Sequence, residues 1–277
     1  MSPNTVISSR SLNIGLAPET LSAVVRCHGR IVAHSDIRIA AAADGGYDGA
    51  LDCLRYYLGR AGSALDGVPV SVAVSVRWCQ LQMLPWSDAL LYAHGARRHC
   101  EAHFAAIYGE QVRSWDFVCD DAPYGQPRLA CAFDAGLVAG LRAIAQQNGH
   151  TLAGIASALC VAGRSLAPSQ KQAIAVIEPQ RIVLATVANG RVDAVQAQAC
   201  IGAWHTYLPD AWQSWTLREP QAGEIARLAL VSVDEGCRFK PLSSTRPELN
   251  AERSSDRAFP RAGAALGSAG AGTFNES

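Results

Sequence analysis

Residues 14–33 read IGLAPETLSAVVRCHGRIVA, and residues 175–194 read AVIEPQRIVLATVANGRVDA. Placed one on the other without a gap, at an offset of 161 positions, the two stretches share Pro18/Pro179, Gly29/Gly190, Arg30/Arg191 and Ala33/Ala194. Each copy alternates apolar and polar residues around a proline turn and a glycine turn, which is typical of a three-stranded meander. Periods below about 50 residues indicate solenoids, so this longer offset instead predicts a duplicated domain with a cleft between the copies.

Composition excludes several classes of partner. The chain has 277 residues, enough for one large domain or two small ones. Its formal net charge is zero, which argues against nucleic acid or an anionic membrane surface as a partner. The chain holds two lysines, Lys171 and Lys240, and neither follows a glycine, so a G-x-x-x-x-G-K-[ST] phosphate loop is excluded. We expect no membrane insertion, because no stretch of about 18 apolar residues occurs, and residues 1–10 show no secretory signal.

The nine cysteines are scattered and form no C-x-x-C motif. Several, such as Cys79 and Cys131, occupy positions in the apolar phase of the sequence, where a free thiol behaves as a small buried hydrophobe. This usage predicts a reduced, cytoplasmic setting.

Apolar periodicity predicts an ordered series of elements in the first half of the chain. It comprises three strands within 12–39, a helix capped by Asp48 and ended by Gly62, strands at 68–76 and 79–83, a helix from Ser87 to Tyr108, strands at 112–119 and 128–133, a helix capped by Asp134 and ended by Gly149, a strand at 152–155 and a helix from Ser157. Without a unit at about 85–150, this is the element order of a ribonuclease-H-like half-domain.

The second half repeats the three strands and then predicts irregular structure around Trp204, Trp212 and Trp215, followed by a strand at 225–233. From Gly236 the chain is rich in Ser, Gly, Arg and Pro, which predicts disorder. The expected division is a first half at 1–84 and 151–170, an inserted α/β subdomain at 85–150, a reduced second half at 171–235 and a disordered tail at 236–277.

A series of short strings carries a family resemblance. In order, the strings are Leu84-Pro85-Trp86 at a strand end, Ala96–Phe104 on the long helix, Ser114-Trp115-Asp116, Arg128-Leu129-Ala130-Cys131-Ala132, Gln147-Asn148-Gly149 and Leu152-Ala153-Gly154-Ile155. With these strings, the chain resembles the actin-like proteins of type IV pilus and type II secretion systems, namely PilM and the cytoplasmic domain of GspL. GspL-type chains continue into a membrane span, whereas this chain ends in a polar tail and in that respect looks more like PilM.

The resemblance implies an α/β, degenerate actin-like (ribonuclease-H-like) fold with two related halves and an inserted subdomain. An actin-type nucleotide site needs two facing Asp-x-Gly hairpins, whose carboxylates hold the water shell of the metal and whose glycines admit phosphate. Asn13-Ile14-Gly15 stands at the first hairpin, with an amide in place of the carboxylate. The second offers Val176-Ile177-Glu178-Pro179, without glycine, and its proline has no N–H to donate. The adjacent glycines Gly45 and Gly46 lie in the wrong half for the adenosine site. We therefore expect no bound cofactor and no catalytic residue.

Other chemistries have weaker support. His99 and His103 are four residues apart on the long helix, but His-Cys-Glu-Ala-His does not match H-E-x-x-H, so we expect no metal site. Ser157 does not lie in a G-x-S-x-G turn. Gly267, Gly270 and Gly272 have no strand before them and no helix after them, as a dinucleotide loop would require.

The sequence thus predicts a non-catalytic scaffold at the cytoplasmic face of the inner membrane. As the resemblance implies, its partner would be the cytoplasmic tail of a single-span assembly protein of a pilus or secretion machine, bound beside the inserted unit. Trp86 and Tyr124 are candidate anchors, and Arg97 and Arg98 could hold acidic groups of the tail. The alternatives are a nucleotide-dependent ATPase or kinase of the same superfamily and a metal-binding protein.

Overall fold

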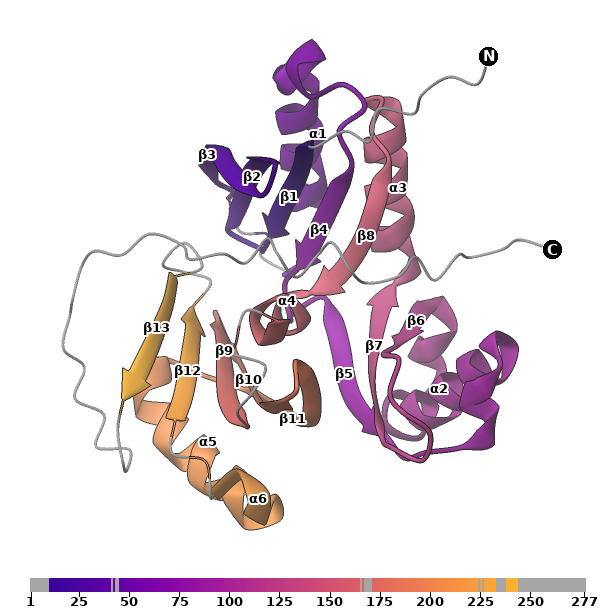
Figure 1. The fold of residues 1–277 in the computed structure, drawn as a ribbon, viewed down its shortest axis with the longest axis vertical. Coiled ribbons are helices and arrows are strands. Elements are labelled where there is room, and N and C mark those ends of the chain that lie inside the picture. The colour runs from indigo at the N-terminus through magenta and orange to yellow at the C-terminus, as the bar shows by residue number, and fades with distance from the viewer. Residues whose placement is uncertain are drawn as a thin grey trace. The chain divides into compact units, whose positions relative to one another are not determined.

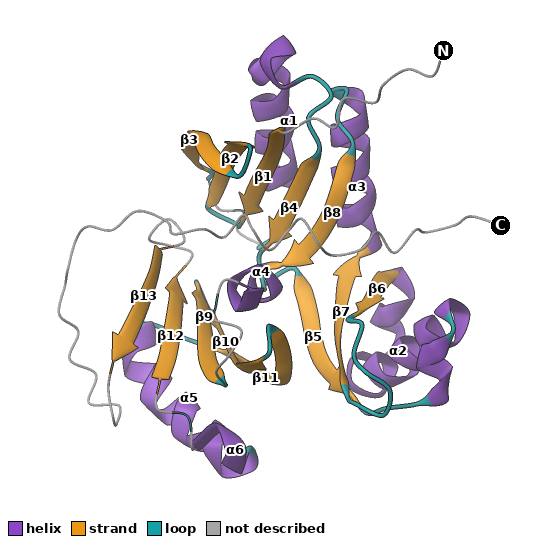
Figure 2. Cartoon of the chain, viewed as in Figure 1, coloured by secondary structure: helices purple, strands orange, loops and turns teal. Residues whose placement is uncertain are grey.

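The computed structural model describes residues 10–40, 42, 45–164, 166, 171–223, 225, 227–232 and 238–243. Within these residues the chain forms three β-sheets with helices packed on them (Figures 1 and 2). They divide into two compact units. The first contains the residues up to Val74 and Ala139–Ala156, and the second contains Ser75–Val138 and the residues from Ser157 onward.

The first sheet has the strand order β3-β2-β1-β4-β8. Its strands are β1 (Arg10–Leu16), β2 (Thr20–Cys27), β3 (Arg30–Arg38), β4 (Val70–Val74) and β8 (Leu152–Ser157). The first three form the predicted antiparallel meander, and β1 runs parallel to β4. In β1 and β4 every second residue is buried, as the alternating sequence predicts.

The helices of the first unit pack through apolar stripes. Helix α1 (Asp48–Ala61) buries Leu51, Leu54 and Leu58, and it ends at Gly62, whose φ of 55° suits glycine. Helix α3 (Ala135–Gln147) begins where the Asp134 carboxylate accepts hydrogen bonds from the amides of Gly136 and Leu137, so its predicted capping role is confirmed. Gly140 of α3 lies so close to α1 that an added Cβ would be 2.7 Å from a Leu51 methyl carbon.

The second sheet repeats the order of the first, as β11-β10-β9-β12-β13. Its strands are β9 (Gln172–Glu178), β10 (Arg181–Ala188), β11 (Arg191–Ala199), β12 (Arg227–Ser232) and β13 (Arg238–Ser243). As in the first sheet, the first three are antiparallel neighbours, and the first strand runs parallel to the fourth.

The sequence repeat corresponds to a structural repeat. β10 and β11 begin and end 161 residues after β2 and β3, respectively. Each pair carries a register shift at the same place, between Val25 and Arg26 in one copy and between Thr186 and Val187 in the other. The turns that follow match as well, because His28-Gly29 and Asn189-Gly190 all have positive φ values between 50° and 76°. The prediction of two related halves is therefore confirmed.

The core of the second sheet corrects one expectation. Residues around Trp204, Trp212 and Trp215 form helix α5 (Trp204–Arg218), followed by the short α6 (Pro220–Gly223). The helix contains Pro209, but Leu208, Ala211 and Trp215 keep helical spacing and pack on β9 and β10. Helix α4 (Ala158–Arg164) also packs against β9, whose residues are almost all buried.

The third sheet belongs to the inserted unit and has the order β5-β7-β6. β5 (Cys79–Leu84), β7 (Arg128–Asp134) and β6 (Trp115–Cys119) are antiparallel neighbours. Helix α2 (Ala93–Tyr108) covers this sheet with Cys100 and Phe104, which pack on Leu84, Ala130 and Ala132.

The predicted boundaries of the inserted unit, at residues 85 and 150, differ from the structure at both ends. Strand β5, which the sequence places in the first half, pairs with β7 of the inserted sheet. Helix α3, which the sequence places in the insertion, packs on α1 through Gly140. The unit therefore runs from β5 to β7. Alternation and apolar stripes show that a face is buried, but they do not show which neighbour buries it.

The expected disordered tail also needs correction in part. Residues 238–243 form β13, which pairs antiparallel with β12. Pro241 lies within this strand, and a proline is tolerated there because β13 is at the edge of its sheet. The composition of this segment predicts disorder because few apolar side chains offset the entropy cost of ordering it. In β13, backbone hydrogen bonds with β12 offset that cost. The remaining residues of the predicted tail, 236–237 and 244–277, lie outside the described residues.

Smaller differences concern helix starts. The helix predicted from Ser87 is interrupted, since Ser87 caps the 3₁₀ turn η2 (Asp88–Leu91) and the extended Tyr92 separates this turn from α2. The strand predicted from Val112 begins at Trp115, after the 3₁₀ turn η3 (Gly109–Ser114). Asp48 is the first residue of α1, not its cap, which is Tyr47. Gly62 also opens the 3₁₀ turn η1 (Gly62–Leu65).

A buried carboxyl group joins two segments of the second unit. Glu178, the last residue of β9, is 2% exposed. Its Oε1 accepts a hydrogen bond of 2.9 Å from the Val76 amide, and its Oε2 accepts one from the Ser75 hydroxyl. The Ser75 Oγ in turn accepts a hydrogen bond from the Arg77 amide at 3.0 Å. Glu178 thereby holds the segment that leads into β5 against the β9–β10 hairpin. Burial raises the pKa of this carboxyl above its ordinary value of 4.5, although these hydrogen bonds and Arg181 oppose the rise.

We expect Glu178→Ala to destabilise the protein, because it leaves the Val76 amide and the Ser75 hydroxyl buried without their acceptor. Such a loss costs about 2 kcal/mol, which corresponds to a fall in melting temperature of roughly 4–8 °C for a unit of this size. Thermal unfolding followed by circular dichroism measures it.

Glu178→Gln is the matched control, because its amide oxygen still accepts from Val76 and Ser75 can rotate to accept from its NH₂ group. A folded pKa above the unfolded value means that the stability from Glu178 falls as pH rises from about 4.5 through the folded pKa. The parent should therefore lose stability relative to Glu178→Gln over that range. A parallel pH dependence in both proteins, or a stable Glu178→Ala, would contradict this role of the carboxyl group.

Candidate functional site

The first predicted nucleotide position lies inside a sheet. Asn13 and Gly15 are on β1, where they pair with Val24 and Ser22 of β2 on one side and with β4 on the other. The turn that follows is tight, with reciprocal backbone hydrogen bonds between Ala17 and Thr20 at 2.9 and 3.3 Å. A phosphate cradle needs several free N–H groups in a loop, whereas the backbone of Gly15 belongs to a strand with neighbours on both sides.

The second predicted nucleotide position is Glu178, and its carboxyl group is engaged by Ser75 and Val76. The β9–β10 turn is Pro179-Gln180, and Gln180 adopts a φ of 64°. A carboxylate buried in this way is not placed to hold the water shell of a metal ion. The structure therefore gives Glu178 a packing role that the sequence did not suggest.

The two predicted aromatic anchors lie together in the second unit. The ring centroids of Trp86 and Tyr124 are 4.7 Å apart, although the residues belong to different loops. Arg128 completes the cluster, with its guanidinium carbon 5.4 Å from the centre of the Trp86 ring. Its Nη1 and Nη2 donate to the carbonyl oxygens of Leu90 and Ala122, both at 3.3 Å. Tyr124 is 74% exposed, so the cluster presents an aromatic surface to solvent. We call Trp86, Tyr124 and Arg128 the aromatic cluster.

The predicted basic residues, Arg97 and Arg98, are exposed on α2. The next residue, His99, lies 3.4 Å from the carbonyl oxygen of Pro85, which precedes Trp86. This contact brings the turn of α2 that carries the two arginines close to the aromatic cluster.

The rings of His99 and His103 are 4.5 Å apart, and burial together with His99 lowers the pKa of His103. Among the described residues, no group of three His, Cys, Asp or Glu side chains could hold a metal ion. Ser157, the remaining candidate nucleophile, is buried and accepts a hydrogen bond from the Cys160 amide at 3.2 Å.

Strand β6 lies at one edge of the inserted sheet. Trp115, Phe117 and Cys119 pack on the α2 core, while Val118 between them is 46% exposed. Within the described part of the chain β6 pairs with β7 alone, so its other edge offers backbone donors and acceptors. Cys119, the last residue of β6, pairs with Ala130, which is two residues from Arg128. The C-terminal end of β6 therefore lies at the same end of the sheet as the aromatic cluster.

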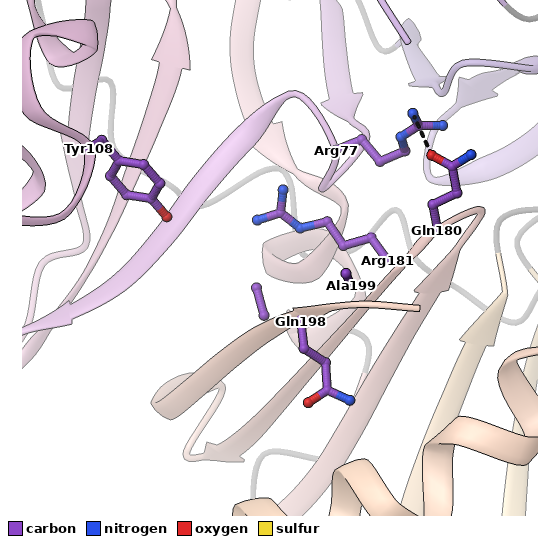
Figure 3. A pocket seen from close by; sticks show the side chains of 7 residues that line it. Arg77, Tyr108, Gln180, Arg181, Gln198 and Ala199 are labelled. Carbon is purple, nitrogen blue, oxygen red and sulfur yellow. Dashed lines mark hydrogen bonds between the residues drawn. The ribbon is translucent and has the colours of Figure 1, made fainter. Parts of the chain in front are cut away.

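A polar pocket of about 350 Å³ lies in the second unit, apart from the predicted anchors. Its lining residues are Arg77, Tyr108, Gln180, Arg181, Ala197, Gln198 and Ala199. Figure 3 shows the Arg181 guanidinium lying between Tyr108 and Arg77. Arg181 donates to the amide oxygen of Gln80 at 2.9 Å, and the Tyr108 hydroxyl donates to the same oxygen at 3.2 Å.

Sequence reasoning missed this pocket and Arg128. The two arginines of the pocket come from segments about a hundred positions apart, and no spacing rule joins them. Arg181 follows directly after the repeated proline turn, which is the one local signal that could have drawn attention to it.

Within the described residues, no helix is long and apolar enough to cross a membrane. No protein-family model and no curated protein matches the chain.

Solved structures reveal the fold. The chain is similar to the cytoplasmic domain of EpsL, an inner-membrane component of the type II secretion system of Vibrio cholerae, with a TM-score of 0.54 and 11% identity over 81% of this chain and 82% of that one. It is similar to a chain of the PilM–PilN type IV pilus biogenesis complex, with a TM-score of 0.51 and 14% identity over 78% and 68% of the two chains. A Bacteroides thetaiotaomicron protein with an actin-like ATPase fold gives a TM-score of 0.49 at 11% identity over 78% and 80%. The predicted resemblance is confirmed at the level of fold: the chain has the α/β, actin-like fold of the GspL cytoplasmic domain and PilM.

Proposed function

We propose that this protein is a non-catalytic scaffold that binds the cytoplasmic tail of a single-span inner-membrane protein in a type IV pilus or type II secretion machine. In this proposal it lies at the inner face of the membrane, held there by protein partners. The fold shared with the EpsL domain and with PilM supports the class of machine.

The observation that carries the docking site is the aromatic cluster beside the end of an edge strand. An extended peptide that adds to β6 would gain main-chain hydrogen bonds, and at the end of β6 it would meet Tyr124 and Trp86. Tyrosine and tryptophan are common at the centres of interfaces because they bury large areas at low entropy cost. Arg97 and Arg98 would then pair with acidic groups of the same peptide.

Trp86→Ala and Tyr124→Ala should each weaken tail binding at least tenfold, since an aromatic anchor of this kind contributes about 2 kcal/mol or more. The measurement is fluorescence anisotropy with labelled peptides that copy the N-terminal tails of membrane proteins encoded beside this one. Tyr56→Ala is the matched control, because Tyr56 is a 61% exposed tyrosine on α1 of the other unit. If no tail binds, or if both cluster variants bind as tightly as the parent, this docking site is wrong.

A second prediction separates the scaffold from an ATPase or kinase. Because the backbone of Gly15 is paired in a sheet and the Glu178 carboxyl is engaged, we expect Mg²⁺–ATP at millimolar concentration to leave the melting temperature unchanged. A ligand at a hundred times its dissociation constant would add about 2.7 kcal/mol. Asn13→Asp restores the missing carboxylate of the first hairpin. It should not restore binding of Mg²⁺–ATP, because the second hairpin still lacks glycine and its Glu178 carboxyl group is still engaged. A Mg²⁺-dependent rise in the parent protein would instead support a nucleotide-binding enzyme.

A further inference from the structure

The pocket between the start of β5, the β9–β10 turn and β11 has an unusual balance of charge. Among the described residues its lining holds two guanidinium groups, a phenol and two amides, with no carboxylate. Ala197 and Ala199 contribute only methyl groups to the lining.

The contacts of the two arginines orient them without neutralising them. Arg77 donates from Nη2 to the Gln180 amide oxygen at 3.5 Å, and Arg181 donates to the Gln80 amide oxygen at 2.9 Å. An amide oxygen carries no net charge, so each guanidinium keeps its positive charge. This differs from Arg191 in the same unit, which lies 3.2 Å from the Asp120 carboxylate. The positive charge of Arg181 also interacts electrostatically with the buried Glu178 carboxyl group. Arg77 is therefore the arginine whose charge is more available to a ligand.

We propose that this pocket binds an oxyanion, either a carboxylate or a phosphate group. A guanidinium presents its N–H groups in a planar fork that matches such groups, and the exposed side of the pocket admits a ligand from solvent. The volume suits a small polyanion or one or two acidic side chains of a bound peptide. Neither the aromatic cluster nor the edge of β6 contributes to this pocket, so anion binding does not depend on tail docking.

The test uses the full chain and three probes at constant ionic strength: inorganic phosphate, citrate and a glutamate-rich peptide, each compared with chloride by calorimetry and thermal shift. The parent protein should bind at least one probe and melt at a higher temperature with it. Saturation by phosphate or citrate identifies a free anion as the ligand, whereas saturation by the peptide alone identifies acidic side chains.

Two variants address the geometry. Arg77→Gln should weaken binding at least tenfold, because it removes the guanidinium with a neutral partner. Gln180→Glu should weaken it similarly while keeping the arginine, since it places a carboxylate beside Arg77. Arg191→Gln, which removes an already paired arginine, should bind like the parent. Three results would overturn the proposal. The probes raise the melting temperature no more than chloride does, Arg77→Gln and Arg191→Gln lose equal affinity for the probe, or Gln180→Glu binds the probe as tightly as the parent.

A separate observation concerns two thiols in the inserted unit. The sulfur atoms of Cys100, on α2, and Cys119, at the end of β6, are 3.1 Å apart. Cys100 is buried and Cys119 is partly buried at the end of the edge strand β6, so Cys119 is the more accessible of the two sulfurs. The hydrogen bond between the two sulfurs lowers the pKa of Cys100 and, together with burial, raises the pKa of Cys119, so the thiolate of this pair forms on Cys100 and the proton stays on Cys119.

We infer that Cys100 and Cys119 are a modification site that forms a reversible disulfide by exchange with a small disulfide such as oxidised glutathione. The Cys119 thiol passes its proton to the Cys100 thiolate and attacks the small disulfide, which forms a mixed disulfide on Cys119 and releases one glutathione thiolate. That glutathione thiolate takes the proton from Cys100, and the Cys100 thiolate then attacks the Cys119 sulfur and releases the second glutathione thiolate. Two protein thiols lose their protons and two electrons, and one small disulfide becomes two thiols.

Peptide mapping of the folded protein after oxidised glutathione treatment should find Cys100 linked to Cys119, with the mass lowered by two hydrogen atoms. Cys100→Ser should instead retain glutathione on Cys119. Cys131→Ser is the control, because the Cys131 and Cys160 sulfurs are 4.0 Å apart and Cys131 is buried, and it should leave the linkage intact. Formation of the linkage only after denaturation, or equal linkage among unrelated cysteines, would refute this assignment.

Discussion

The second unit depends on one buried carboxyl group. Glu178 closes strand β9 and accepts hydrogen bonds from the segment that begins at Ser75, so the route of the chain into β5 is fixed from a residue about a hundred positions away. Removing a carboxyl from water is costly unless its oxygens are hydrogen-bonded, and here both are. The same contact sets the place of Arg77, one residue beyond Val76, and of Arg181, just after the turn. The hydrogen bonds of Glu178 to Ser75 and Val76 therefore position the two arginines that line the polar pocket.

Much of the fold could be predicted from periodicity because its strands and helices carry local signals. The valines of β4 alternate, the leucines of α1 form a stripe, and Gly62 ends that helix where its φ requires glycine. The misjudged elements are those decided by a distant partner. Helix α5 forms despite Pro209 because β9 and β10 accept its apolar side, and β13 forms because β12 offers it an edge.

The candidate site was predictable only in part, for a similar reason. Trp86 and Tyr124 stand out in the sequence by their residue types and by their places at a strand end and in a turn, and in the fold their ring centroids are 4.7 Å apart. In the sequence, Arg128 is only the first residue of a predicted strand, and the fold places its guanidinium over the Trp86 ring. The pocket arginines have no local signature, because a side chain's partner across a hundred residues is set by topology.

The repeated hairpin shows how a duplicated element can acquire two uses. The bulge, the turn and the strand bounds coincide in both copies, so the backbone has diverged less than the side chains. At the residue just before the shared proline, one copy has the buried Ala17 and the other has Glu178. The alanine side chain needs no hydrogen-bond partner. The buried glutamate needs donors from outside its own hairpin, and Ser75 and Val76 supply them. The two halves are therefore no longer interchangeable: a chimera with two first-half hairpins would keep both sheets but lose the acceptor for its linking segment.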